Sequence, residues 1–164
     1  IFRERNMERS ILEAFLEIPY GIYVLITAQN MGPRAMVVSW VSQASYSPPL
    51  LLVALRKNRP VIPVILEQNI FSLNLLREGQ VSWVDRFKGP DLSQNIGECY
   101  EEVRLGTQKF FRLKTALAFW ACRVVSKIAP GDHLLIVSEA LAASAEKGKP
   151  LITSDCGKTY VGRT

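Results

Sequence analysis

The side chains that could perform chemistry in this sequence of 164 residues are few. The single histidine, His133, has no partner whose position the sequence fixes. The cysteines Cys99, Cys122 and Cys156 are odd in number and have no metal-ligand spacing, so we interpret them as reduced thiols and expect no metal site. Motifs of phosphate-binding loops, serine hydrolases and zinc proteases are absent from the sequence. The residues alone therefore indicate no particular reaction.

Positive charge is the second chemical feature. The chain carries 20 basic and 15 acidic residues, a formal net charge of +5. Its densest basic group, Arg56-Lys57-Asn58-Arg59, is too short to form a stripe for nucleic acid or an anionic membrane. The charge therefore favours an anionic small molecule, or no ligand at all. Since no apolar stretch approaches the ~20 residues of a membrane helix and no secretory signal is seen, we expect a cytoplasmic protein without membrane or nucleic-acid partners.

The elements that must position these residues follow from the hydrophobic pattern. Apolar residues at helical spacing predict an N-terminal helix that ends before Pro19, within residues 1–18. Short helices are predicted over residues 60–67 and 80–87. Runs rich in β-branched and aromatic residues predict strands, over residues 21–27, 35–43, 50–55, 70–76, 115–125 and 133–141.

The remaining segments complete a prediction of one domain over residues 1–164. Residues 88–108 are polar and contain glycine, so we predict a functional loop there, and residues 142–164 are predicted to form a C-terminal arm. Regular alternation of strands and helices is absent, which disfavours a parallel sheet. The prediction is a mainly β chain that forms a small closed antiparallel barrel with short inserted helices, because closure removes exposed strand edges.

Four segments occur in an order that is typical of one family. Residues 36–50 combine alternating hydroxyls at a strand end with Pro48-Pro49 and an apolar strand. Phe71–Leu76 has the pattern Phe-x-x-Asn-x-Leu, and the short motifs Asp85-Arg86-Phe87 and Gly131-Asp132-His133 follow. Together these segments resemble the flavin reductase-like family over roughly residues 21–141. The amino-acid sequence of residues 39–45 is especially similar to that of the flavin reductase domain at the C-terminus of some flavodiiron proteins.

The resemblance implies an FMN-binding split barrel of Greek-key type that forms a homodimer, with flavin at the subunit interface. Candidate cofactor-binding residues are Ser39, Trp40, Val41, Ser42, Gln43 and Ser45 for the ring and ribityl chain, and Lys57, Asn58 and Arg59 for the phosphate. A helix N-terminus beside basic residues suits an anion. His133 is the candidate catalytic residue for the nicotinamide step. Structural roles stay open: core packing for Trp40, strand capping for the serines, a solvated loop at residues 57–59, and a half-exposed turn for His133.

The function that the resemblance implies is hydride transfer from NADH or NADPH to flavin. A second hypothesis is an FMN-binding electron carrier that has no nicotinamide site and passes electrons to a protein partner. A third is a flavin reductase domain of a larger flavodiiron protein. The sequence does not choose between NADH and NADPH, or between FMN as substrate and as prosthetic group. For Asn74, which has apolar neighbours in a strand, we predict a role in satisfying backbone groups.

Overall fold

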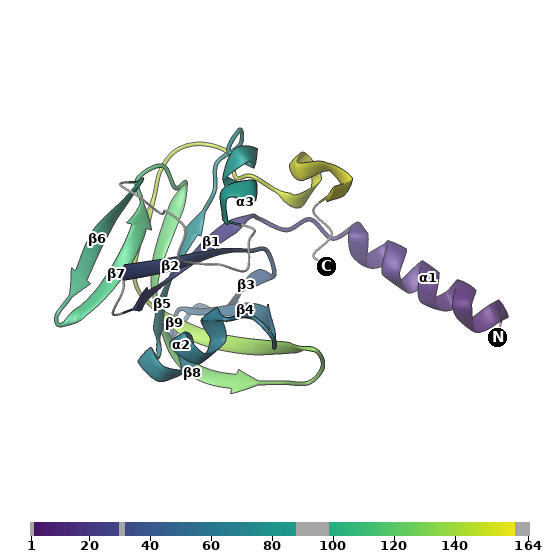
Figure 1. The fold of residues 1–164 in the computed structure, drawn as a ribbon, viewed down its shortest axis with the longest axis horizontal. Helices are drawn as coiled ribbons and strands as arrows, with labels where there is room; N and C mark the ends of the chain where they lie inside the picture. Colours follow the sequence, from purple (N-terminus) through teal and green to yellow (C-terminus); the bar gives the residue numbers. More distant parts are fainter. Residues whose placement is uncertain (1, 30–31, 88–98, 160–164) are drawn as a thin grey trace.

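A computed structural model describes residues 2–29, 32–87 and 99–159 (Figure 1). The helices are α1 (Phe2–Leu16), α2 (Val61–Gln68), α3 (Val81–Phe87) and the 3-10 helix η2 (Thr153–Thr159). The strands are β1 (Tyr23–Gln29), β2 (Gly32–Val38), β3 (Val41–Ser45), β4 (Leu50–Arg56), β5 (Ile70–Leu75), β6 (Tyr100–Leu105), β7 (Gln108–Leu113), β8 (Ala118–Ile128) and β9 (His133–Ala145). The prediction of a mainly β chain is confirmed. No helix within the described ranges is long and apolar enough to cross a bilayer.

Seven strands form one antiparallel sheet in the order β2-β1-β5-β8-β9-β4-β3. Its two end strands, β2 and β3, are consecutive in the chain and joined only by Ser39 and Trp40. Since Cα atoms along a chain are about 3.8 Å apart, the ends of the sheet must come within about 11 Å of each other. The sheet therefore rolls up, but among the described strands no ladder joins β2 to β3, so closure of the barrel is not confirmed.

The strand predicted over residues 35–43 is wrong as one element, because the chain turns at Ser39 and Trp40. Val41 N–H donates to the Ser39 carbonyl (2.9 Å), and Ala54 N–H donates to the Trp40 carbonyl (2.9 Å). These bonds transfer the chain from the β1–β2 hairpin to a new pairing with β4. Apolar and β-branched residues continue across the turn without a glycine or proline, which is why the hydrophobic pattern alone did not reveal it.

The loop predicted over residues 88–108 is also wrong for its described part, where β6 pairs with β7. Charged residues dominate β6, so its apolar pattern is weak. The hairpin is attached to β5 by side chains: Ser72 Oγ accepts Phe111 N–H (2.9 Å), and Asn74 Oδ1 accepts Leu113 N–H (2.8 Å). The Asn74 amide also donates to the Val24 and Phe111 carbonyls, which confirms its predicted structural role. Residues 88–98 lie outside the described residues.

Two large apolar clusters hold the elements together. One joins the sheet to α2 and includes Leu55, Ile65 and Cys122, and the other joins it to α3 and includes Val84. The helix α1 instead extends away from the sheet, with most of its apolar side chains exposed (Figure 1). After β9, which continues to Ala145, the chain returns so that buried Leu151 N–H donates to the Leu76 carbonyl (2.9 Å).

Candidate functional site

A pocket of about 540 Å³ opens where the ends of β2, β4 and β9 face the C-terminal part of α1. This volume lies within the usual range for small-molecule sites. Its polar or aromatic lining residues are Tyr20, Ser39, Trp40, Arg56, Arg59, Asp132, His133 and Thr153. The apolar part of the lining is Leu12, Phe15, Leu16, Ile18, Met36, Val37, Val38, Ala54 and Leu55.

Strand pairing brings the basic group and the histidine turn together. In the antiparallel β4–β9 ladder Arg56 is the register partner of His133. Just beyond it, Lys57 N–H donates to the Asp132 carbonyl (3.1 Å). The chain then enters α2, where Ile62 N–H donates to the Arg59 carbonyl (3.1 Å). The two chemical features that the sequence places far apart therefore share one end of the sheet.

The imidazole of His133 is held at one nitrogen. Its Nδ1 lies 2.7 Å from Asp132 Oδ1, and the His133 side chain is 17% exposed against 83% for Asp132. The hydrogen bond from His133, followed by the charge attraction of the same ring, lowers the pKa of the Asp132 carboxyl. An ionised carboxylate only accepts hydrogen bonds, so we assign the Nδ1 proton to His133, which leaves Nε2 as the nitrogen available to a ligand.

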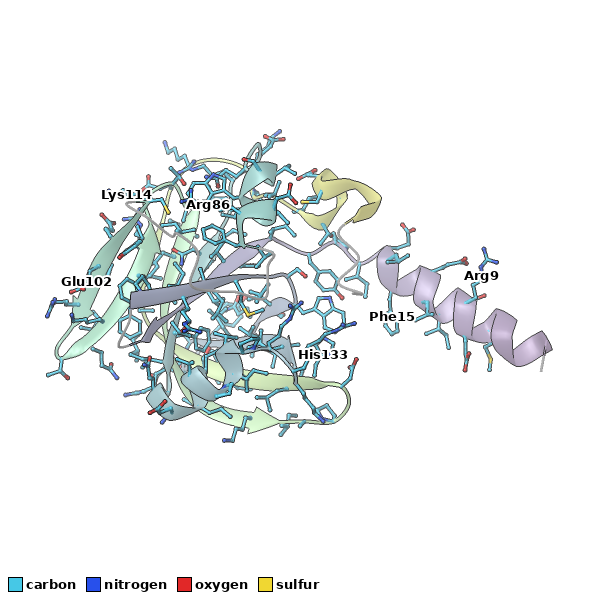
Figure 2. All side chains as sticks on the ribbon, in the orientation of Figure 1. Arg9, Phe15, Arg86, Glu102, Lys114 and His133 are labelled. Carbon is cyan, nitrogen blue, oxygen red and sulfur yellow. The ribbon has the colours of Figure 1, made fainter. Side chains whose placement is uncertain are left out.

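Aromatic rings form one wall of the pocket. The Trp40 indole stacks on the His133 ring, with 4.5 Å between centroids and 27° between planes. Tyr20 is a second aromatic neighbour of Trp40, at a centroid distance of 6.2 Å. Trp40 is 47% exposed, so it is a wall of the pocket and does not pack in the core. In Figure 2, His133 lies on the side of the sheet from which α1 extends.

The structure separates the predicted site residues into two groups. The pocket contains Ser39, Trp40, Arg59 and His133. The residues that do not line it are Val41, Ser42, Gln43 and Ser45 on the edge strand β3, and Lys57 and Asn58 on an exposed turn. Ser42 and Gln43 are exposed, and their side chains bond within β3, where Ser42 Oγ donates to the Gln43 carbonyl (3.1 Å) and Gln43 Nε2 donates to the Ser45 carbonyl (3.4 Å).

Sequence reasoning missed several pocket residues. Arg56 and Asp132 lie within motifs that it noted, but only the β4–β9 register shows that they face one site. Tyr20 and Thr153 come from opposite ends of the chain and are joined by two bonds, from Thr153 N–H to the Tyr20 carbonyl (2.8 Å) and from Tyr20 N–H to Thr153 Oγ1 (3.2 Å). No local sequence signal could have revealed this contact.

The donor set of the pocket suits a planar, anionic ligand. Trp40 and His133 offer flat surface, and Ser39 and Thr153 offer hydroxyls. Arg59 lines the pocket, and within the described part of the chain no carboxylate pairs with it. A guanidinium binds phosphate through well-aligned hydrogen bonds. These residues therefore fit a phosphate-bearing ring compound such as a flavin or nicotinamide nucleotide.

Comparison with known proteins gives a consistent match. The family described as "Flavin reductase like domain" matches residues 15–160. The chain is similar to Diflavin flavoprotein A 1 of Synechocystis sp., with 28% identity over 152 residues that cover 90% of this chain and 26% of that protein. It is also similar to Flavin reductase (NADH) of Kitasatospora aureofaciens, with 28% identity over 138 residues that cover 81% of this chain and 70% of that protein.

The fold is found in solved structures as well. The styrene monooxygenase flavin reductase of Pseudomonas putida S12 superimposes with a TM-score of 0.76 at 23% identity, covering 87% of this chain and 91% of that chain. The chain therefore spans most of that reductase, but only about a quarter of the length of the diflavin flavoprotein that it matches.

Proposed function

Because the chain belongs to the flavin reductase-like domain family, we propose that it is an oxidoreductase that transfers hydride from NADH or NADPH to a flavin. The observation that carries the proposal is the pocket, where a stacked aromatic wall, a histidine and two arginines lie together. The relative named Flavin reductase (NADH), which aligns with 81% of this chain, supports the same reaction.

The bound flavin supplies the hydride-accepting ring, and the protein supplies binding and orientation. Trp40 and His133 provide a flat wall against which a planar ring can pack. Arg59, just before α2, attracts a phosphate, which supports a phosphate-bearing flavin, FMN as proposed or FAD, over riboflavin. His133 Nε2 is available to hydrogen-bond the flavin edge or the nicotinamide amide.

A homodimer completes this proposal. The hydroxyl and amide side chains of β3 lie on an open edge, and the apolar residues Met7, Ile11 and Phe15 of α1 are exposed. A second copy that covers both would bury apolar surface and enclose the β3 side chains in a shared site. Sedimentation at micromolar concentration should give twice the chain mass, and a monomer that still binds flavin would refute this part.

A second candidate function is that of a reductase domain within a longer chain. The match to a diflavin flavoprotein, of which this chain spans 26%, favours it. In that arrangement the flavin would pass electrons to another domain. The two candidates differ in the electron acceptor, and both need the same flavin and nicotinamide sites.

The direct test is anaerobic stopped-flow mixing of the purified chain, loaded with FMN or FAD, with NADH and with NADPH. Loss of the absorbance of oxidised flavin after mixing supports reductase activity. The nucleotide that bleaches the flavin faster is the preferred donor. Flavin that binds, as judged by fluorescence quenching, but stays oxidised would leave the chain as an electron carrier. Absence of flavin binding at micromolar concentration would contradict both candidates.

A further inference from the structure

We propose that Trp40 is a positioning residue, which fixes the plane of the His133 imidazole by stacking on it and so presents one ring edge to the pocket. The inference rests on the proposed role of His133 in flavin reduction and extends it to a residue that acts through the histidine. The structural observation that supports it is the stacking of the Trp40 and His133 rings, whose centroids are 4.5 Å apart.

Backbone hydrogen bonds fix the place of Trp40 at the edge of the pocket. The Trp40 carbonyl accepts Ala54 N–H at 2.9 Å, and the neighbouring turn is closed by Val41 N–H on the Ser39 carbonyl at 2.9 Å. These bonds fix the short link between the two end strands of the sheet. Strand pairing therefore fixes the backbone from which the indole reaches the pocket and the His133 ring.

A second aromatic ring neighbours the indole. Tyr20 lies 6.2 Å from Trp40 between centroids, at 37° between planes. Its backbone is tied in both directions to Thr153, which belongs to the C-terminal segment. Trp40 therefore contacts both Tyr20 and His133, and main-chain hydrogen bonds hold the backbone of Tyr20 and of Trp40.

The other constraint on His133 is weak by comparison. Asp132 bonds to Nδ1, but its side chain is 83% exposed, so water competes for the carboxylate. The other charged groups around this turn are Arg56, which acts on Asp132 from β4, and Arg59 in the same pocket. A single exposed hydrogen bond fixes one ring atom and leaves the ring plane free to tilt. Stacking on Trp40 supplies the missing constraint.

Preorganised groups need no rearrangement when the ligand arrives. Loss of the indole should therefore loosen His133 without removing it. Loss of the contact energy of an aromatic pair of this kind should slow flavin reduction by a factor of about 3 to 10. The effect should appear in the maximal rate of flavin reduction more than in the KM for the nicotinamide nucleotide, because the ring must be placed when hydride moves.

A double-mutant cycle tests the proposal. We expect Trp40→Ala to slow flavin reduction about 3- to 10-fold, Trp40→Phe to stay within about twofold, and the Trp40→Ala/His133→Ala double variant to be no slower than His133→Ala. Tyr46→Ala is the control, since Tyr46 is an aromatic residue of the next segment that is 89% exposed, and its rate should be unchanged. Independent, additive losses from Trp40→Ala and His133→Ala would overturn the proposal, as would a full rate for Trp40→Ala.

A measurement without flavin separates this inference from the proposed function. An indole held in one orientation against a second ring gives a near-ultraviolet circular dichroism signal, which is measured for Trp40 as the difference between the wild type and Trp40→Phe. The same difference in the His133→Ala background should be clearly smaller, with far-ultraviolet circular dichroism as the check on folding. A Trp40 signal that loss of the imidazole leaves unchanged would overturn the positioning contact. Absence of flavin reduction together with an intact Trp40 signal would count against the proposed function alone.

Discussion

Two neighbouring parts of one sequence segment have opposite surroundings in this protein. Ser39 and the 47% exposed Trp40 line an open pocket, whereas Ser42 and Gln43, a few residues later, lie outside it on the edge strand β3. The pocket wall has partners from distant elements, such as Tyr20 and His133 around Trp40. The exposed side chains of Ser42 and Gln43 bond to carbonyls of their own strand.

The difference shows which part of the candidate site is built by a single chain. The wall already has its rings and charges in place, so its contribution to binding should be present in any folded copy. The edge offers the right hydrogen-bonding groups without enclosure, and groups exposed to water contribute little to affinity. We therefore expect large effects from substitutions in the wall and small ones from substitutions on the edge.

The largest expected effect is on stability, in the apolar core behind the pocket wall formed by Trp40 and His133. Pocket residues Met36, Val38 and Leu55 belong to the same apolar cluster as Cys122, whose pKa burial raises from 9.0 to about 12. Folding therefore favours the protonated thiol, and this stability is complete below pH 9 and is lost as pH rises towards 12. The loss is at most about 4 kcal/mol, since one pKa unit corresponds to 1.36 kcal/mol.

Denaturant unfolding between pH 8 and pH 11 would measure this loss of stability, because the pH range spans the ordinary thiol pKa of 9.0 and approaches the raised pKa of about 12. The free energy of unfolding of wild type should fall more steeply with pH than that of Cys122→Ala. Burial also raises the pKa of Tyr23, so a smaller common slope should remain in both proteins. Equal slopes would show that the thiol is not protected by the core behind the wall.

Next in size is the effect of the phosphate contact. Arg59→Ala should weaken FMN binding roughly 10- to 100-fold, as expected for a charge-assisted hydrogen bond, and leave riboflavin almost unaffected. Lys57→Ala is the matched control, because Lys57 is exposed outside the pocket. Fluorescence titration of the two ligands measures both. A larger loss for Lys57→Ala would place the phosphate on the exposed turn.

Removing the imidazole should have a smaller but catalytic effect. His133→Ala is expected to slow flavin reduction about tenfold or more, equivalent to about 1.4 kcal/mol of barrier, with FMN affinity changed no more than a few-fold. Stopped-flow traces at saturating NADH and NADPH provide the rate. An unchanged rate would make His133 a structural turn residue that only contacts Asp132 and Trp40.

The smallest expected effect is on the edge strand. Ser42→Ala and Gln43→Ala should change FMN affinity by less than about threefold in an isolated monomer, because exposed hydrogen bonds exchange freely with water. If the chain dimerises over β3, the same substitutions should have a larger effect in the dimer. Titration at concentrations above and below the dimer dissociation constant compares the two. A large loss in the monomer would show that the edge binds flavin by itself.

Local sequence features were sufficient for much of the fold. The predicted strands at 21–27, 50–55 and 70–76 match β1, β4 and β5 closely, because β-branched runs and flanking turn residues act over a few positions. The hairpin β6–β7 was missed since its anchors are side chains of β5, including Asn74, and its own charged strand has little apolar pattern.

The site shows the same division. By itself the sequence determined which residue types the candidate site could use: His133 after a turn, a hydroxyl-rich strand end, and a basic group before a helix. Only the tertiary structure decided which of them meet. The β4–β9 register placed Arg56 opposite His133, and the turn at Ser39 directed Trp40 onto the imidazole while leaving Ser42 outside. Strand register depends on contacts between residues far apart in the chain, and no local spacing encodes them.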